Sequence, residues 1–310
     1  MATLLARASV VSEPAESMEM WITRRFQLTA EGKRCPFAAI ASLAERIAHS
    51  NAKYWLRADP VHLSVNRDRV VLLDASQLDI TPAESTALVA TLQAHFRGDD
   101  LTFIAPHVER WYVTSDKAIG IRTHPVSTVR GRNVADYWFD GTDRALWQTR
   151  LSEMQMLLHA HPVNEAREAA GQLAINGVWF WGEGEMPSTF KHHYAQIIAR
   201  DVLFEGIAAL SSAQFVDASR FHWSELTSEL KENTIVILDQ LDVSAAYGEW
   251  EAWQTSLSAL DQNWFTPALA LLQKGHLKTI TICAPSEKNG KTFSTSRIDQ
   301  LKFWRRSHIT

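Results

Sequence analysis

The sequence predicts an α/β protein with a mostly parallel sheet, helices on both faces and a smaller α+β region. The main observation lies in the C-terminal third, where the β-branched run Thr234–Leu238 (TIVIL) precedes apolar residues at steps of three or four, from Trp250 to Leu271. A second apolar strand, Lys278–Ala284 (KTITICA), follows them. A strand, a long helix and a strand in this order predict a right-handed crossover between parallel strands.

The N-terminal half alternates between predicted helices and strands. A proline in its first turn opens the first helix, and a Thr-Pro-Ala-Glu sequence at Thr81, typical of a capping box, opens the second. Alternating or β-branched apolar runs indicate the strands. The predicted helices are Pro36–Ala48 and Thr81–Phe96, and the predicted strands are Lys53–Arg57, Arg69–Leu73, Leu101–Ala105 and Arg110–Thr114.

Two further helices meet at a proline. Apolar residues from Leu146 to Leu158 form one face of an amphipathic helix, which Pro162 should end because the residue before a proline is pushed out of the helical region. The same proline suits the start of a second helix, Val163–Ala170, closed by Gly171. The apolar run Gly177–Trp181 (GVWFW) then has the pattern of a strand buried on both faces.

Composition argues against two classes of protein. The formal charge is −4, whereas nucleic-acid-binding proteins usually carry a concentrated basic surface. Only Lys302–Arg306 (KFWRR) is locally basic, and we interpret it as a solvated tail. No apolar run approaches the ~20 residues of a membrane span, and the N-terminus makes a poor signal peptide. We therefore expect a cytoplasmic protein without nucleic-acid or membrane partners.

No metal or cofactor is predicted. Cys35 and Cys283 are the only cysteines, too few for a disulfide framework or a thiolate zinc site, and a reactive thiol at Cys35 is the less favoured alternative. His159 and His161 do not share a helix face, and zinc requires three or four converging ligands. In the last turn of a helix, His159 interacts favourably with the helix dipole.

Asp59-Pro-Val-His62 (DPVH) lies between two predicted strands, on a loop of the kind that often carries functional residues. The pair fits three uses: metal coordination, acid/base chemistry, or the bracing of a turn. We favour bracing, because Asx-turns before proline are common.

The sequence His161-Pro-Val-Asn164, with Arg167 one turn later, opens a helix whose free backbone N–H groups favour an anion. Asn164 and Arg167 are three residues apart and can face one ligand. The alternative is internal: Arg167 pairs with Glu165 or Glu168, and Asn164 holds the loop. The residues leave these two interpretations equally open.

Three segments together resemble the RpfE-type bacterial regulatory proteins: WLRADPVHL, RWYV, and the stretch Met154–Pro187. The pattern HPVN-x-x-R-x-x-x-G…N…G-x-G-x-x-P within that stretch is also similar to the archaeal-type cofactor-independent phosphoglycerate mutases of the alkaline-phosphatase superfamily. This resemblance implies an α/β core of alkaline-phosphatase type formed by residues 1–58 and 188–310. Residues 59–187 would then form an inserted α+β region like the mutase substrate-binding domain.

The sequence also departs from the mutase pattern. The family implies an N-terminal Asp-Gly metal motif, a nucleophilic serine, and Asp/His ligands after the late strands. Here no Asp-Gly precedes the first helix, Asp239 and Asp242 have no following histidine ligand, and Trp181 stands where an arginine is expected. Two-metal phosphoryl transfer depends on such ligands, because the metals carry the developing charge.

We therefore predict a catalytically degenerate, mutase-like protein that binds a small anionic ligand or a protein partner and serves a regulatory role. One alternative is a metal-independent hydrolase or phosphotransferase that uses Asp59 and His62 as an acid/base pair. Another is a structural interaction partner with a tryptophan-rich interface. The predicted ligand-binding residues are Asp59, His62, His161, Asn164, Arg167, Asn176 and Trp181.

Overall fold

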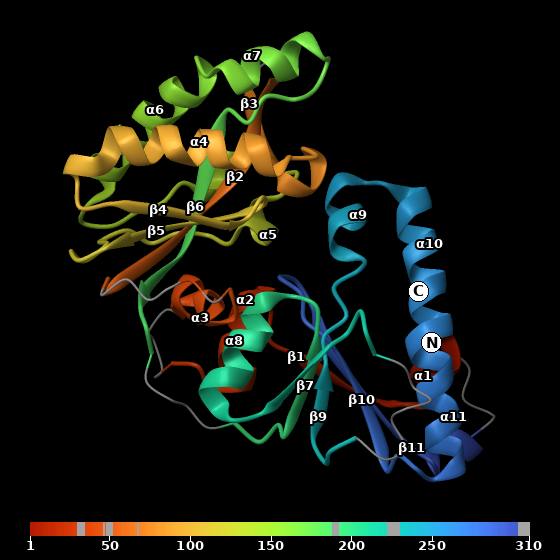
Figure 1. Cartoon of the computed structure of the whole chain (residues 1–310). Helices are drawn as coiled ribbons and strands as arrows, with labels where there is room; N and C mark the ends of the chain where they lie inside the picture. Colours follow the sequence, from red (N-terminus) through yellow and green to blue (C-terminus); the bar gives the residue numbers. More distant parts are fainter. Residues whose placement is uncertain are drawn as a thin grey trace.

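A computed structural model of the chain describes residues 1–29, 35–45, 47, 52–66, 68–187, 192–221 and 230–302. Within these ranges the strands form three sheets, and Figure 1 shows the largest of them above the other two. The fold is mixed α/β, with helices packed against each sheet.

The largest sheet has five strands in the order β3-β2-β5-β4, with β6 paired to the other side of β2. Every pairing in it is antiparallel. Short connections join β2 to β3 and β4 to β5, and these two pairs form hairpins. The strands are β2 (Tyr54–Asn66), β3 (Arg69–Asp74), β4 (Thr102–His107), β5 (Arg110–Ser115) and β6 (Gly177–Glu185).

Helices cover both faces of this five-stranded sheet. On one face lie α4 (Pro82–His95), α6 (Arg144–His159) and α7 (Pro162–Ala169), at the top of Figure 1. Their apolar side chains pack against even-numbered residues of β2 and β6, such as Leu56 and Val178.

The opposite face of the five-stranded sheet is covered by shorter elements. They are α3 (Phe37–Ala44), α5 (Val126–Val129) and the 3-10 helix η3 (Val134–Tyr137). They pack against odd-numbered residues of β2 and β6, with α3 at Trp55 and α5 and η3 at Trp179. The two faces therefore carry alternate residues of each strand, as the pleat requires.

The second sheet is parallel and has the order β8-β7-β9. It consists of β7 (Gln196–Ala199), β8 (Gln214–Asp217) and β9 (Thr234–Val236), and α8 (Val202–Ser211) crosses from β7 to β8. Acidic residues follow the carboxyl ends of β7 and β9, where open α/β sheets usually bind ligands.

The third sheet is antiparallel and joins the two ends of the chain. Its order is β1-β11-β10, with β1 (Ser9–Glu13), β11 (Gly290–Ser296) and β10 (Thr279–Ala284). The helices α1 (Ala2–Arg7) and α2 (Met18–Phe26) flank β1, and the 3-10 helix η6 (Asp299–Leu301) follows β11.

The prediction of a mostly parallel sheet is wrong. Among the described strands only β7, β8 and β9 pair in parallel, and β10 pairs with β11 rather than extending a crossover from β9. Five residues separate β10 from β11, a connection short enough to favour an antiparallel hairpin over a long crossover. The predicted long helix from Trp250 to Leu271 is confirmed as one continuous helical run, formed by α10 (Trp250–Leu260), a π-helical segment (Asp261–Phe265) and α11 (Thr266–Lys274). A separate short helix, α9 (Asp242–Tyr247), precedes it.

Several local predictions are confirmed. Thr81 and Glu84 form the predicted capping box, and Pro162 occupies the first turn of α7.

No helix in the described part of the chain is long and apolar enough to cross a membrane. The domain division at residue 58 stays a prediction, and β2 runs across that boundary. Of the tail Lys302–Arg306, all but Lys302 lies outside the described residues.

Candidate functional site

A buried ion pair lies in the middle of the five-stranded sheet, on the face that α3, α5 and η3 cover. Arg57 and Asp59 are two residues apart in β2, so their side chains leave the strand on the same face. Asp59 Oδ1 accepts hydrogen bonds from Arg57 Nε at 2.8 Å and Nη2 at 2.6 Å. Only 5% of Arg57 and 4% of Asp59 are exposed, so the pair is almost fully removed from water.

Two aromatic side chains complete this cluster, which we call the Arg57 cluster: Arg57, Asp59, Tyr112 and Trp181. The antiparallel register places Trp181 of β6 opposite Arg57, and Tyr112 of β5 opposite it on the other side. Trp181 Nε1 donates to Asp59 Oδ2 at 2.7 Å. The guanidinium carbon of Arg57 lies 5.0 Å from the centroid of each ring, which is cation–π distance.

The electrostatics of the cluster leave one donor available. Burial raises the pKa of Asp59, while the Arg57 charge and the Trp181 N–H oppose that rise. Burial also raises the pKa of Tyr112, so its hydroxyl stays protonated at neutral pH. Among the described residues, the buried hydroxyl of Tyr112 has no hydrogen-bond partner. The bonds of Arg57 to Asp59 use Nε and Nη2 and do not involve Nη1. Buried polar groups normally have partners, so the Tyr112 hydroxyl is the donor in this cluster that an acceptor would satisfy.

Two glycines bring helix α3 close to β6 beside the cluster. Gly182 has φ +70° and Gly184 has φ +149°, values that residues with a side chain rarely adopt. A Cβ at Gly184 would lie 2.6 Å from Pro36 Cβ, and one at Gly182 would lie 3.0 Å from the Ala38 backbone nitrogen. The close approach lets Phe37 pack on Trp181, with ring centroids 6.4 Å apart.

Acidic residues at the carboxyl end of the parallel sheet lie near this face. Asp201 follows β7, caps α8 through Leu203 N at 2.8 Å, and acts electrostatically on Arg57. Asp239 follows β9; loss of solvation, together with the charges of Asp201 and Asp242, raises the pKa of its carboxyl. Within the described ranges, no three His, Cys, Asp or Glu side chains are grouped to hold a metal ion.

His62 does not join Asp59. The two residues are three apart in one strand, so their side chains lie on opposite faces of the sheet. The Nδ1 atom of His62 is instead 2.8 Å from the carbonyl oxygen of Ala174. Because Asp59 is held by Arg57 and Trp181, this geometry does not favour an acid/base pair.

Asn164 and Arg167 are buried in internal hydrogen bonds. Asn164 Nδ2 donates to the carbonyl oxygens of Leu158 at 2.7 Å and Ile175 at 2.9 Å, and its Oδ1 accepts from Ile175 N at 2.7 Å. Arg167 donates to Leu173 O at 2.7 Å, to Glu84 Oε1 at 2.9 Å and to the carbonyl of Leu78. The geometry favours the internal alternative, although the partner of Arg167 is Glu84 rather than Glu165 or Glu168.

His161 and Asn176 also make internal contacts. His161 caps α7 by accepting from Val163 N at 3.1 Å through Nδ1, and its Nε2 lies 3.1 Å from Thr91 Oγ1. It borders an open groove of about 500 Å³ between α4 and α6. Asn176 bonds both backbone groups of Leu63, at 2.7 and 3.1 Å. Of the seven predicted residues, only Asp59 and Trp181 lie in the Arg57 cluster.

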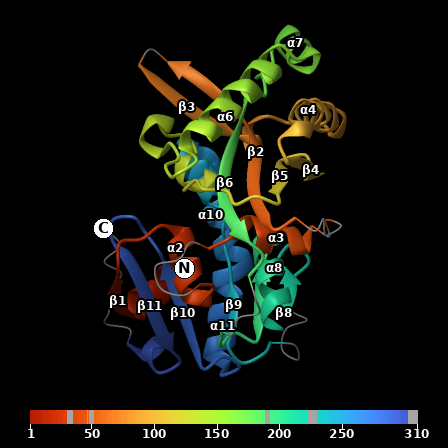
Figure 2. The same ribbon diagram turned by 90° about the vertical axis from the view of Figure 1, so that its left-hand side faces the viewer.

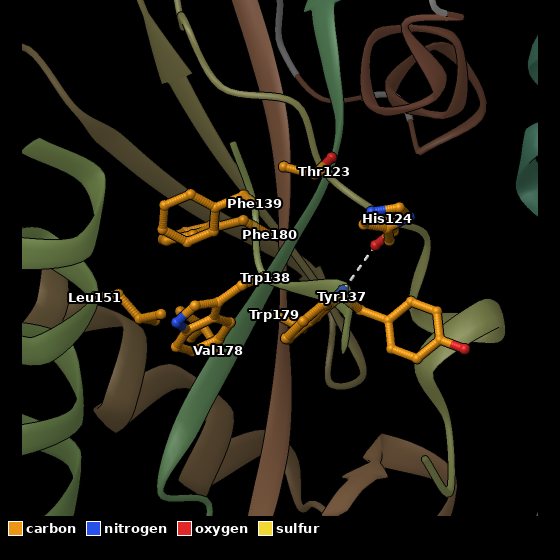
Figure 3. Close-up of a pocket in the computed structure, with 9 residues that line it drawn as sticks. All are labelled: Thr123, His124, Tyr137, Trp138, Phe139, Leu151, Val178, Trp179 and Phe180. Atoms are coloured by element: carbon orange, nitrogen blue, oxygen red, sulfur yellow. Dashed lines mark hydrogen bonds between the residues drawn. The ribbon is translucent and has the colours of Figure 1, made fainter. Parts of the chain in front are cut away.

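A second aromatic group lies further along the same face. Figure 3 shows Trp138 and Trp179 beside Tyr137 and His124, with the hydrogen bond from Trp179 Nε1 to the His124 carbonyl oxygen at 2.7 Å. The rings of Trp138 and Trp179 stack with centroids 6.0 Å apart. The recess between these residues has no space for a water molecule, so we interpret the group as packing.

Sequence reasoning missed Arg57, Tyr112 and Asp201. A signal for Arg57 was present, because Arg-x-Asp within a strand places both charges on one face. Asp201 directly follows the apolar run of β7, as Asp239 follows the run TIVIL. Tyr112 had no local signal, because its place beside Arg57 depends on the pairing of β2 with β5.

Part of the chain is similar in sequence to known mutases. It is 23% identical over 164 residues to a probable 2,3-bisphosphoglycerate-independent phosphoglycerate mutase of Geobacter sulfurreducens, covering 52% of this chain and 40% of the relative. It is 26% identical over 98 residues to the 2,3-bisphosphoglycerate-independent phosphoglycerate mutase of Methanothrix thermoacetophila, covering 30% and 25%. The match spans less than half of either relative, and it indicates distant homology.

Among solved structures, the PH0037 protein from Pyrococcus horikoshii has a similar fold, with a TM-score of 0.52, 11% identity, and coverage of 95% of this chain and 79% of that one. A cofactor-independent phosphoglycerate mutase from Thermoplasma acidophilum aligns with a TM-score of 0.39, 13% identity, and coverage of 95% and 81%. No family model matches the chain, and the resemblance to RpfE-type proteins stays a prediction.

Proposed function

We propose that this chain is a catalytically degenerate relative of the phosphoglycerate mutases that binds a small anionic ligand in the cytoplasm. The observation that carries the proposal is the hydrogen bond of 2.7 Å from Trp181 Nε1 to Asp59. The mutase pattern implies an arginine at this position, which would pair with a phosphate group. The indole of Trp181 has a single N–H donor, and this group donates to Asp59. A regulatory role is what the resemblance to RpfE-type proteins implies.

The proposed ligand contacts are Arg57 Nη1 and Tyr112 Oη. Both belong to buried side chains; the Tyr112 hydroxyl has no partner among the described residues, and the bonds of Arg57 to Asp59 do not use Nη1. Because Asp59 already balances the charge of Arg57, the cluster offers directed hydrogen bonds without a large excess of positive charge. This arrangement favours a ligand with one carboxylate or a singly charged phosphate. Phosphoglycerate, named in both curated relatives, carries a carboxylate of this kind and is the first ligand to test.

The binding test uses Tyr112→Phe, which removes a hydroxyl that holds no bond in the free protein. We expect calorimetric titration with 3-phosphoglycerate, phosphate and glycerate to show binding of at least one by the unmodified protein. Tyr112→Phe should weaken it by about three- to tenfold, the worth of one hydrogen bond. Tyr194→Phe is the matched control, since Tyr194 is another buried tyrosine and lies outside the cluster. Absence of binding, or equal weakening in both variants, would contradict the proposed site.

The catalytic test is separate. We expect no interconversion of 2- and 3-phosphoglycerate by the purified protein, with Mg²⁺ or Mn²⁺ present. Sustained turnover that disappears with a chelator would contradict catalytic degeneracy while leaving the ligand site open to the first test.

A role as a protein-interaction partner is supported by one observation. Trp250 on α10 is 64% exposed and stacks on Trp253 with ring centroids 5.1 Å apart. Exposed tryptophans are enriched at interfaces because one residue supplies a large contact area. Capture of a specific partner that Trp250→Ala loses would favour this role over ligand binding.

A further inference from the structure

Among the described strands, the edge strand β1 has one side along which another strand can pair. Within these ranges β1 pairs with β11 on one side only, and Figure 2 shows it at the outer edge of its sheet. We propose that this edge pairs antiparallel with β1 of a second copy of the chain, which joins two three-stranded sheets into one of six strands.

The side chains of β1 are exposed on both faces of the sheet. Val10 is 53% exposed and Val11 is 60% exposed, although neighbouring residues of a strand point in opposite directions. Ser9 and Ser12 are exposed as well. The strand therefore offers unpaired backbone groups flanked by apolar side chains, and this combination promotes pairing with another strand.

Two edge strands of the five-stranded sheet carry features that hinder pairing. The edge strand β4 contains Pro106 and an irregular register between Ile104 and His107. The edge strand β3 is bridged by Arg130 and Asn133. β1, in contrast, has no proline, glycine or lysine, and its register with β11 is continuous from Ser9 to Glu13. Natural sheets usually protect an edge with such residues or with a bulge, and β1 has none of them.

Symmetry favours a second copy as the partner. A two-fold axis perpendicular to the sheet makes β1 antiparallel to its own copy, and the same surface then serves both subunits. Along an edge strand, the N–H and C=O groups of every second residue point away from the sheet. In an antiparallel pair such a residue must lie opposite another residue of the same kind, so the residue on the two-fold axis lies opposite its own copy. That pair is Val10 with Val10 or Val11 with Val11. In neither register does Glu13 face another carboxylate, so no repulsion opposes the pairing.

Sedimentation velocity over the micromolar range tests the proposal. We expect the unmodified chain to form a dimer. Lysine at the residue on the axis, Val10→Lys or Val11→Lys according to the register, should raise the dimer dissociation constant by about fivefold, because it places like charges directly opposite each other across the paired strands. Far-UV circular dichroism should stay unchanged, since both side chains are exposed.

The matched control is Val65→Lys. Val65 is 76% exposed on β2, far from β1 in the fold, so this variant should dimerise like the unmodified chain. A monomer at every concentration would overturn the proposal. It would equally be overturned by a dimer that persists in both β1 variants, or by one that Val65→Lys dissociates.

Discussion

Replacing Asn164 by alanine tests whether this residue holds the fold together or serves a ligand. Asn164→Ala removes two hydrogen bonds to Ile175, which is fully buried and has no other backbone partner among the described residues. The carbonyl of Leu158 keeps its bond from His161 N at 3.1 Å. Each buried group left unpaired costs about 1–3 kcal/mol, so two of them reduce the free energy of unfolding by about 2–6 kcal/mol. This loss is a large fraction of the stability of a typical domain.

Urea unfolding followed by tryptophan fluorescence and circular dichroism measures the effect. If the five-stranded sheet unfolds in its own transition, the loss should appear there, because Ile175 and the helix α7 that carries Asn164 both pack against this sheet. Asn66→Ala is the matched control, since Asn66 is exposed at the end of β2 and should change stability by less than about 0.5 kcal/mol. A loss below about 1 kcal/mol for Asn164→Ala would refute the interpretation of Asn164 as a structural residue.

Two further predictions concern ionisable side chains. Burial raises the pKa of Cys35 to about 12, so this thiol should react slowly with iodoacetamide at mildly alkaline pH. We expect the reagent to label Cys283 in the folded protein and Cys35 only in denaturant. Peptide mapping that finds early labelling of Cys35 would contradict this prediction. Desolvation opposes the shift at Glu84, but hydrogen bonds from Thr81 and Arg167 lower its pKa. A lowered folded-state pKa stabilises the protein above the ordinary glutamate value of about 4.3, and this contribution is lost as the pH falls through the folded-state pKa. Stability measured from neutral to acidic pH should therefore fall more steeply for the unmodified protein than for Glu84→Gln, and parallel curves would contradict the assignment.

The sequence by itself determined the local elements of this protein. The capping box at Thr81, the proline that opens α7 and the apolar run GVWFW each act over a few residues, and each lies in the predicted element. Capping and strand periodicity depend on neighbours in the sequence, so they can be recognised without the rest of the chain.

Only the tertiary structure decided which strands pair. The run KTITICA is a strand as predicted, but it is half-exposed and antiparallel to β11 rather than parallel to β9. A strand offers the same backbone groups to any neighbour, so its partner depends on where the rest of the chain places other strands.

The candidate site follows the same division. The sequence identified Asp59 and Trp181, but it grouped them with Asn164 and Arg167, which the structure uses in internal hydrogen bonds on the other face of the sheet. A one-residue step along a strand reverses the face of a side chain, so neighbours in a motif need not be neighbours in space. The meeting of Arg57, Tyr112 and Trp181 required the register between three strands far apart in sequence, and that register exists only once the sheet has formed.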